Sequence, residues 1–520
     1  MIIRNKMIRP VFLIFSIFLL IHPADAEQGP EAAANLGNAV NSECNELNPV
    51  ITTDGKTLYF CRDECPGGEQ KQKIWISHLL PDGTWSEAEL MPEPLNNENN
   101  NFVCSVSQDG NSLLLGSVYK RSGGMSRGIS ISHRTEDGWS FPEEVEIQNY
   151  YNLNNFGSFF LSSDGKTLLM AIQRDDSFGE RDIYISFLQF DGSWSEPQNI
   201  GATINTKGNE ISPFLAPDGR TLYFSSDGRD GYGSADIYIS RRLDDSWGRW
   251  SEPKNLGPEV NTENWDAYYK TSAKGDYAYM VSMDNSIGKS DIFRMEIPDD
   301  QRPDPVMLVS GKVQSYKSLK PLAATIRYET LPEGIEFAIA RSDPSDGDYS
   351  VSLPVGKYYS YLPEADDYLG TNIDLDLKKY DEYTELEQDI LLIPKKDSLI
   401  CIRNLFFAYN STRLSRESLQ ERKRLVKFLK ENPNTVVEVS GHTDNIGSQA
   451  YNLILADRRA RAAIRYLERN GIDEDRIIKK VGGLHKPVVP NKTDQDRALN
   501  RRVEFLVYRP DKEKSDFSGE

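Results

Sequence analysis

The chain is 520 residues long and contains 79 Asp and Glu against 60 Lys and Arg, which gives a formal net charge of −19 at pH 7. This length exceeds what one hydrophobic core supports and predicts about three domains, and the ordinary composition excludes disordered and collagen-like chains. An acidic chain repels nucleic acid and anionic lipid, so neither is expected as a partner.

Residues 1–26 have the pattern of a secretory signal peptide. A basic start ending at Arg9 precedes an apolar run over residues 11–21, and residues 24–26 (Ala-Asp-Ala) offer a small-x-small cleavage site. The apolar run is shorter than the roughly 20 residues that a membrane anchor needs, and no other segment is long and apolar enough to span a membrane. We therefore expect an exported protein with no transmembrane segment after signal cleavage.

Export makes disulfide bonds feasible. Four cysteines lie early in the chain, namely Cys44, Cys61, Cys65 and Cys104, and Cys401 stands alone. Cys61 and Cys65 flank a short loop and are candidates for a bridge. A zinc site does not fit, because the spacing is wrong and no His lies close among the cysteines. We expect structural cysteines with the pairing left open, and neither a metal nor a cofactor.

Internal repetition is the strongest organisational signal. An Asp-Gly pair followed by a short apolar run recurs about every 55 residues, within the range of propeller repeats. The pairs begin at Asp54, Asp109, Asp164, Asp218 and, in degenerate form, Lys274. Asp-Gly makes a tight hairpin turn, and one small sheet cannot bury both faces unless such sheets stack radially. The repeats predict an all-β propeller over residues 35–298 with five blades, with six as the alternative count.

The order of parts predicts how the propeller closes. The fifth repeat ends near residue 298 without an Asn-Leu-Gly unit like that at residues 255–257, and such a unit stands instead at residues 35–37. The N-terminal segment is expected to complete the last blade and remove an open edge. Repeated Asp and Glu are expected to brace turns and blades by hydrogen bonds, and repeated Trp to form a packing layer (Trp85, Trp139, Trp194 and Trp250). These repeats resemble the PD40, or WD40-like, family of TolB-type periplasmic proteins.

Residues 306–395 read as strands and turns and predict a small β-sandwich of about seven strands. Segments such as Val309 to Gln314 and Asp389 to Pro394 carry the strand pattern. This region resembles the carboxypeptidase regulatory-like domain. An acidic run at Asp343, Asp346 and Asp348 does not have EF-hand spacing, so a solvated turn is favoured over a calcium site.

Residues 400–508 change to a mixed pattern. Strand-like segments cover residues 402–410, 435–441, 477–481 and 503–507, and amphipathic helices are predicted over residues 415–430 and 452–470. The order predicts an α+β domain of βαβαββ type with helices on one sheet face. This region is also basic: residues 400–510 contain 22 Lys and Arg against 13 Asp and Glu, a surplus of 9 that leaves −28 for the rest. A basic end suits an anionic polymer.

The segments NLFFAYNSTRL, VSGHTDNIGS, YNLILADRRARAAIRYL and NKTDQDRALNRRVEF stand in this region in that order. They resemble the OmpA-like C-terminal domain, which binds peptidoglycan noncovalently. The resemblance implies that Asp444 and Arg459 hold diaminopimelate of the stem peptide, with the carboxylate taking the ammonium and the guanidinium taking the carboxylate. The other matching positions are Thr443, Asn452, Asn500 and Arg501. Asn452 is expected to brace the loop, and Asn500 and Arg501 to line the groove.

These features predict a non-enzymatic anchor in the periplasm, associated with the cell wall and the inner face of the outer membrane. The propeller is expected to present a face to a protein partner, and family analogy makes an outer-membrane secretion complex one candidate. A cell-wall hydrolase or a propeller-type periplasmic enzyme is the alternative. The sequence contains no H-E-x-x-H or Walker motif, and only four histidines follow the signal (His78, His133, His442 and His485).

Overall fold

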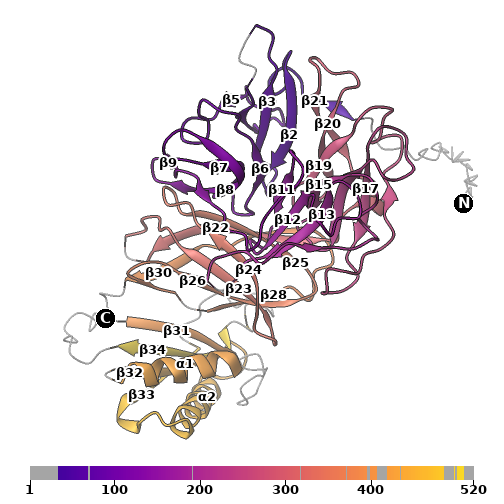
Figure 1. The fold of residues 1–520 in the computed structure, drawn as a ribbon. Coiled ribbons are helices and arrows are strands. Elements are labelled where there is room, and N and C mark those ends of the chain that lie inside the picture. Colours follow the sequence, from indigo (N-terminus) through magenta and orange to yellow (C-terminus); the bar gives the residue numbers. More distant parts are fainter. Residues whose placement is uncertain are drawn as a thin grey trace, which may run out of the picture.

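The computed structural model describes residues 33–67, 71–189, 191–316, 318–370, 372–394, 399–406, 419–433, 435–484, 497 and 500–508. The chain is mostly β, with several small sheets and few helices (Figure 1). The predicted signal peptide and His485 lie outside the described residues. Within those residues, no helix combines the length and apolar character that crossing a bilayer requires.

Residues 34–296 form five small antiparallel sheets, one for each sequence repeat. We call this part the five-sheet body. The first sheet contains β2 (Asn45–Ile51), β3 (Thr57–Asp63), β4 (Lys73–His78) and β5 (Glu89–Leu90). The second contains β6 (Val103–Val106), β7 (Ser112–Tyr119), β8 (Met125–Thr135), β9 (Gly138–Trp139) and β10 (Glu143–Glu144).

The remaining three sheets repeat the same order. The third contains β11 (Ser158–Leu161), β12 (Thr167–Ile172), β13 (Asp182–Phe187) and β14 (Gln198–Asn199). The fourth contains β15 (Glu210–Leu215), β16 (Thr221–Ser226), β17 (Asp236–Arg241) and β18 (Lys254–Asn255). The fifth contains β19 (Ala267–Thr271), β20 (Tyr277–Ser282), β21 (Asp291–Glu296) and β1 (Ala34–Asn35).

The N-terminal strand completes the fifth sheet, as the repeat order predicted. β1 pairs with β21 in antiparallel register, with Asn35 opposite Phe293. Side chains add to the pairing, because Asn35 Nδ2 donates a hydrogen bond to Asp291 Oδ2 (2.6 Å) and Asn41 Nδ2 donates to the carbonyl of Ile292 (2.9 Å). The first strands of the sheets also contact one another in turn, from β2 through β6, β11, β15 and β19 and back to β2.

The Asp-Gly turns form as predicted. Four of their glycines have φ between +68° and +74°, a conformation that glycine adopts without steric cost (Gly55, Gly110, Gly165 and Gly219). In the third turn, Asp164 Oδ1 accepts hydrogen bonds from the backbone N–H groups of Lys166 (2.7 Å) and Thr167 (2.9 Å). Glu210 braces its sheet by accepting from Ser226 Oγ (2.7 Å). The repeated acids are therefore hydrogen-bond partners of turns and strands.

The cysteine pairing corrects the candidate bridge between Cys61 and Cys65. Cys65 instead forms a disulfide with Cys44, 21 residues away. The reason is strand geometry: Cys61 lies inside β3 with its side chain buried in the core, whereas Cys65 follows the strand in a loop. Cys61 and Cys104 are buried free thiols, and the side chain of Cys401 lies outside what the structure describes.

Two further sheets follow a short 3₁₀ helix (Asp299–Gln301) and enclose one core. We call them the two-sheet body. It has nine described strands, not seven. One sheet contains β22 (Val306–Ser315), β25 (Asp348–Pro354), β27 (Tyr368–Leu369), β29 (Thr384–Glu387) and β30 (Ile390–Pro394). The other contains β23 (Thr325–Leu331), β24 (Ile335–Arg341), β26 (Tyr358–Glu364) and β28 (Ile373–Asp376).

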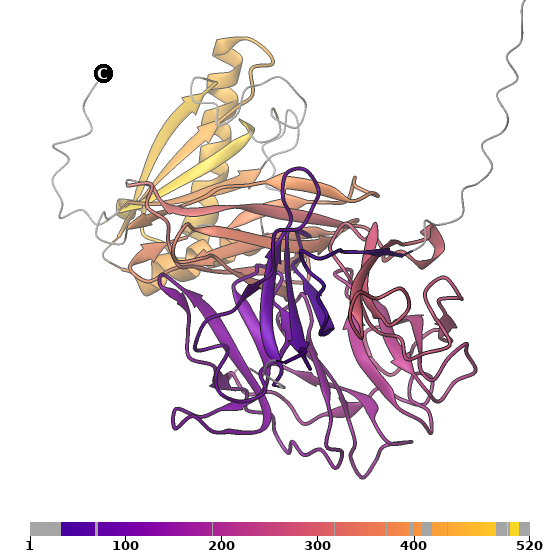
Figure 2. The same cartoon turned by 90° about the horizontal axis from the view of Figure 1, so that it is seen from above.

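The two-sheet body lies between the five-sheet body and the C-terminal part in both views of the molecule (Figures 1 and 2). It meets the five-sheet body at the ends of the sheets that carry Asp-Gly turns. Asp109 Oδ2 accepts a hydrogen bond from the backbone N–H of Arg341 (2.6 Å), and Gln108 Oε1 accepts from that of Ser352 (3.0 Å). Lys166 and Glu336 add an ion pair at 3.3 Å.

The C-terminal unit follows the predicted βαβαββ order. Its sheet has the order β31-β34-β32-β33, and α2 packs on the last three of these strands. Apolar residues of both helices and the sheet form one core. The elements are β31 (Leu399–Phe406), α1 (Leu419–Glu431), β32 (Val436–His442), α2 (Gln449–Arg469), a 3₁₀ turn (Glu474–Arg476), β33 (Ile477–Gly483) and β34 (Arg502–Tyr508).

Candidate functional site

Asp444 lies just beyond the end of a central strand. β32 ends at His442, and the backbone N–H of Thr443 donates a hydrogen bond to the carbonyl of Gly483 (3.0 Å), which fixes the chain where it leaves the sheet. Asp444 follows with only 4% of its surface exposed. Its Oδ1 accepts from the backbone N–H of Ile446 (3.1 Å), so the carboxylate is held by its own loop.

Helix α2 carries Arg459 on its inward face. The helix begins after Ser448, whose side chain caps it by accepting from the backbone N–H of Tyr451 (3.3 Å). One face of the helix is buried at a spacing of three to four residues (Asn452, Leu455, Ala456, Arg459, Ala460, Ala463 and Leu467). Arg459 is fully buried at a position where this pattern calls for an apolar residue. A buried guanidinium in a packing stripe needs polar partners.

The polar partners of Arg459 come from the strand end and the pocket. Its Nη1 donates a hydrogen bond to the carbonyl of His442 (3.0 Å). Burial lowers the pKa of Arg459 to about 10, an effect that Asp444 opposes and the nearby charge of Arg501 reinforces. The group therefore stays protonated at neutral pH, and it interacts electrostatically with Asp444.

Asp444 and Arg459 line one pocket of about 250 Å³. Its lining residues are Asp444, Ile446, Gly447, Tyr451, Asn452, Leu455, Arg459 and Arg501. Arg501 pairs with the carboxylate, since its Nη1 lies 2.9 Å from Asp444 Oδ2. The pocket thus presents two cationic groups and one carboxylate side by side, which suits a ligand that carries both an anionic and a cationic group.

The structure brings together four of the six predicted site residues: Asp444, Asn452, Arg459 and Arg501. Asn452 contacts the loop as expected, because its Nδ2 donates to the carbonyl of Ile446 (3.1 Å). Thr443 and Asn500 are buried and do not line the pocket. The sequence reasoning missed Tyr451, which is 46% exposed beside the pocket. Its place in the first turn of α2, one residue before Asn452, was the available signal.

A second polar group braces the strand end from behind. His442 is buried with its Nε2 3.3 Å from Glu504 Oε2, and Arg502 Nε donates to Glu504 Oε1 (2.9 Å). Burial alone raises the pKa of Glu504, but the hydrogen bond from His442 and the charge of Arg502 lower it to about 2. Glu504 is therefore ionised at neutral pH and lies beside His442 at the end of β32. Among the described residues, no group of three or more His, Cys, Asp or Glu side chains is placed to hold a metal ion.

A close backbone approach sets the position of α2. A Cβ atom at Gly441 of β32 would lie 2.0 Å from the carbonyl oxygen of Ala456, a backbone atom that cannot move aside without moving the helix.

We expect Gly441→Ala to lower the stability of the C-terminal unit by about 3 kcal/mol or more, as severe overpacking does. Urea unfolding followed by far-UV circular dichroism measures this. Ser440→Ala, one residue earlier, is the control and should change stability by less than about 0.5 kcal/mol; equal stabilities of the two variants would contradict the prediction.

The sequence matches the OmpA family over residues 406–501. It is 40% identical over 101 residues to outer membrane porin F of Pseudomonas fluorescens, covering 19% of this chain and 31% of that protein. It is 35% identical over 113 residues to the peptidoglycan-associated lipoprotein of Pseudomonas putida, covering 22% of this chain and 68% of that protein. The crystal structure of the peptidoglycan-associated lipoprotein from Burkholderia pseudomallei aligns at 27% identity and a TM-score of 0.20, covering 20% of this chain and 89% of that one.

The OmpA family model matches the C-terminal unit. The chain spans less than a third of the length of the porin F proteins that it matches and about three fifths of an outer membrane protein A from Bordetella avium. The pocket with Asp444 and Arg459 falls inside the matched range.

Proposed function

The chain belongs to the OmpA family through its C-terminal unit, and from this we propose that it anchors noncovalently to peptidoglycan by holding the diaminopimelate of the stem peptide. One observation carries the proposal: Asp444 and Arg459, of opposite charge and both buried, line the same pocket. A free end of diaminopimelate bears an ammonium and a carboxylate on one carbon, so one acid and one base suffice to bind it.

In this proposal each side chain has a separate role. Arg459 takes the ligand carboxylate with its planar fork, and Asp444 takes the ammonium. Arg459 exposes no surface and Asp444 is paired with Arg501, so binding requires a rearrangement in which Arg501 moves. Asn452 braces the loop through the carbonyl of Ile446. Thr443 and Asn500 act from behind the pocket wall as positioning residues.

For the rest of the chain we propose a five-bladed propeller over residues 35–298, a carboxypeptidase regulatory-like sandwich over residues 306–395 and the binding domain over residues 400–508. Support for the propeller comes from the circuit of contacts among the first strands and from the pairing of β1 with β21, which gives the fifth sheet a fourth strand like the others. Support for the sandwich is the single core that the two sheets share.

The protein so built is a periplasmic scaffold and not an enzyme. The wall holds one end, and the propeller presents a face to a protein partner, for which an outer-membrane secretion complex is the candidate by family analogy. The hydrogen bonds between the two-sheet body and the five-sheet body support a fixed orientation of the propeller.

The test is retention of the full chain on purified sacculi. We expect the protein to sediment with sacculi whose stem peptides contain diaminopimelate, and to stay in solution with sacculi whose third stem residue is lysine, because lysine lacks the second carboxylate. The soluble fraction is assayed for released muropeptides at the same time. Equal retention on both kinds of wall, or release of fragments, would refute the anchor proposal.

A further inference from the structure

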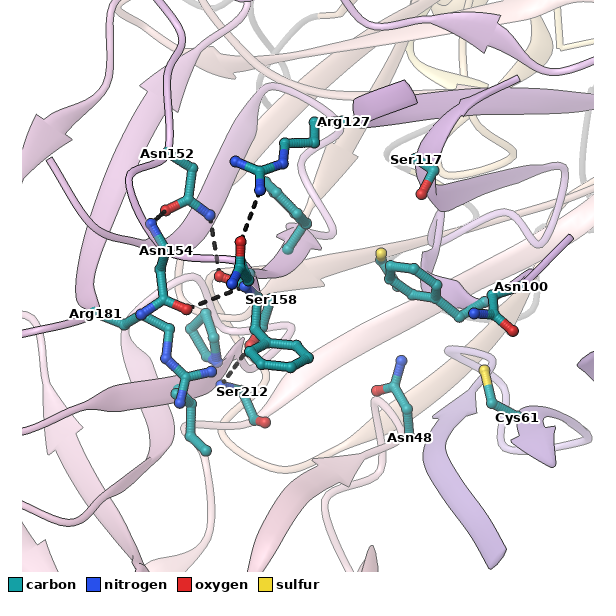
Figure 3. A pocket seen from close by; sticks show the side chains of 18 of the residues that line it. Asn48, Cys61, Asn100, Ser117, Arg127, Asn152, Asn154, Ser158, Arg181 and Ser212 are labelled. Atoms are coloured by element: carbon teal, nitrogen blue, oxygen red, sulfur yellow. Dashed lines mark hydrogen bonds between the residues drawn. The ribbon is translucent and has the colours of Figure 1, made fainter. Parts of the chain in front are cut away.

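A large pocket lies where the five sheets meet. Its volume is about 1010 Å³, and each of the five sheets contributes lining residues. Figure 3 shows side chains around this space, with Asn48 and Cys61 on one side and Arg127, Asn154 and Arg181 on the other. No described residue of the two-sheet body lines it. That body contacts the opposite, Asp-Gly ends of the sheets, so it leaves the pocket mouth uncovered.

The charge of this pocket is opposite to that of the surrounding chain. Among the described lining residues there are three cationic side chains, namely Arg127, Arg181 and Lys270, and one carboxylate, that of Asp63. The chain outside residues 400–510 carries a net charge of −28. A local excess of positive charge in an acidic body focuses the field on a complementary ligand.

None of these three cations forms an ion pair within the described part of the chain. Arg127 Nη2 donates to Asn155 Oδ1 (2.7 Å), and Arg181 Nε donates to Asn209 Oδ1 (2.8 Å), so both contacts are to neutral amides. Lys270 is 5% exposed, and its Nζ donates to Asn48 Oδ1 (2.9 Å) and to the carbonyl of Cys104 (3.1 Å). Buried cations are normally paired with an acid, but Lys270 contacts two neutral acceptors instead. Arg181 feels the charges of Asp227 and Glu180 without forming an ion pair with either.

The backbone of the pocket wall is strained at repeated positions. Asn48, Ser117, Ser212 and Tyr268 all line the pocket, and all have φ between +48° and +68°. Each lies at a register shift in its strand. Such bulges re-aim side chains, and a left-handed tyrosine is an outlier that only its surroundings can impose. Conformational strain of this kind gathers at binding sites.

From the three lining cations that form no ion pair and the strained wall we infer that this pocket binds an acidic peptide segment of a partner protein in extended form. The three cations differ in burial, from exposed Arg127 through half-buried Arg181 to buried Lys270. Cations at three different depths suit a ligand that carries several carboxylates along an extended peptide, and they suit a single compact anion less well. Exposed Phe156 and half-buried Trp265 add aromatic surface for the side chains between the carboxylates.

The inference rests on the proposed partner-presenting role of the five-sheet body, and it names the chemistry of that partner. The test uses fluorescence anisotropy of the full chain with a fluorescein-labelled oligoglutamate peptide, in the absence of peptidoglycan. A failure here therefore leaves the wall-anchoring proposal untouched, and a failure on sacculi leaves this one untouched. We expect binding that weakens steeply with salt, and at least tenfold weaker binding of an oligoglutamine peptide of the same length.

Three variants assign the binding to the pocket. Arg181→Gln, Arg127→Gln and Lys270→Met should each weaken oligoglutamate binding about tenfold, and the two arginine variants keep the test valid should the buried lysine variant fold poorly. Lys254→Met removes an exposed charge from β18 and is the matched control, expected to bind like the wild type. Equal affinity for oligoglutamate and oligoglutamine, wild-type binding by the arginine variants, or binding of oligogalacturonate in place of the peptide would overturn the inference.

Discussion

Asp444→Asn is expected to weaken binding of a diaminopimelate-containing muropeptide by at least about 100-fold, which corresponds to about 3 kcal/mol. The substitution keeps the size of the side chain and removes its charge. The ligand ammonium then loses the one carboxylate that the described residues supply to the pocket, and it faces Arg459 and Arg501. Isothermal titration calorimetry with the soluble muropeptide measures the loss directly.

A separate substitution tests the guanidinium of Arg459. Arg459→Lys retains the positive charge but loses the planar fork and the hydrogen bond to the carbonyl of His442. We expect this variant to lose affinity nearly as far as Asp444→Asn. Arg461→Gln is the matched control, because Arg461 lies two residues along the same helix, pairs with Asp457 on the surface and is absent from the pocket. Wild-type affinity in either pocket variant, with a normal circular dichroism spectrum, would remove the clamp from the mechanism.

The sequence was sufficient for features that depend on local periodicity. The Asp-Gly spacing located the turns because glycine at positive φ is a local requirement, and the N-terminal Asn-Leu-Gly unit located the pairing of β1 with β21. The helical stripe from Asn452 to Leu467 predicted the inward face of α2. Asp444 and Arg459 were placed at the candidate site by the resemblance to the OmpA-like domain, because the helical pattern alone does not distinguish a buried ligand-binding arginine from a surface charge.

Features set by long-range packing could not be predicted in this way. The pairing of Cys44 with Cys65 joins the segment before β2 to the loop after β3, whereas Cys61 is buried within β3. The closeness of Cys61 and Cys65 in sequence therefore gave the wrong partner. The ion pair of Arg501 with Asp444 joins residues 57 positions apart. Likewise, Arg127 lies in β8, Arg181 directly before β13 and Lys270 in β19, so their convergence on one pocket follows from how three sheets are arranged and has no sequence pattern of its own.

Lys270 is expected to weaken the fold that contains it. Burial lowers the pKa of Lys270 to about 8 from an ordinary value of 10.5, because the ammonium gives up its hydration for two neutral acceptors. Below pH 8 the Lys270 side chain is charged in both the folded and the unfolded chain. Burying the charged ammonium then lowers the free energy of unfolding by the full amount of about 3 kcal/mol. Between pH 8 and pH 10.5 the unfolded chain binds the proton more tightly, so the stability of the wild type rises with pH until the cost is gone.

Lys270→Met removes this dependence. The variant loses the donor to Asn48 and Cys104, a constant penalty of about 1–3 kcal/mol that does not vary with pH. Relative to Lys270→Met, the wild type should therefore gain about 3 kcal/mol of stability from pH 7 to pH 10.5.

Denaturant unfolding followed by tryptophan fluorescence reports the five-sheet body alone, because all seven tryptophans lie between residues 75 and 265. Lys254→Met should show no such pH dependence, since its lysine is exposed. A parallel pH course of wild type and Lys270→Met would mean that the lysine is not desolvated. A binding site for an acidic ligand needs a cation that is not already paired with an acid of the protein, and such a buried cation lowers the stability of the fold. The unfolding experiment therefore tests the charge of Lys270 in the free protein, and the peptide titration tests the same charge in the complex.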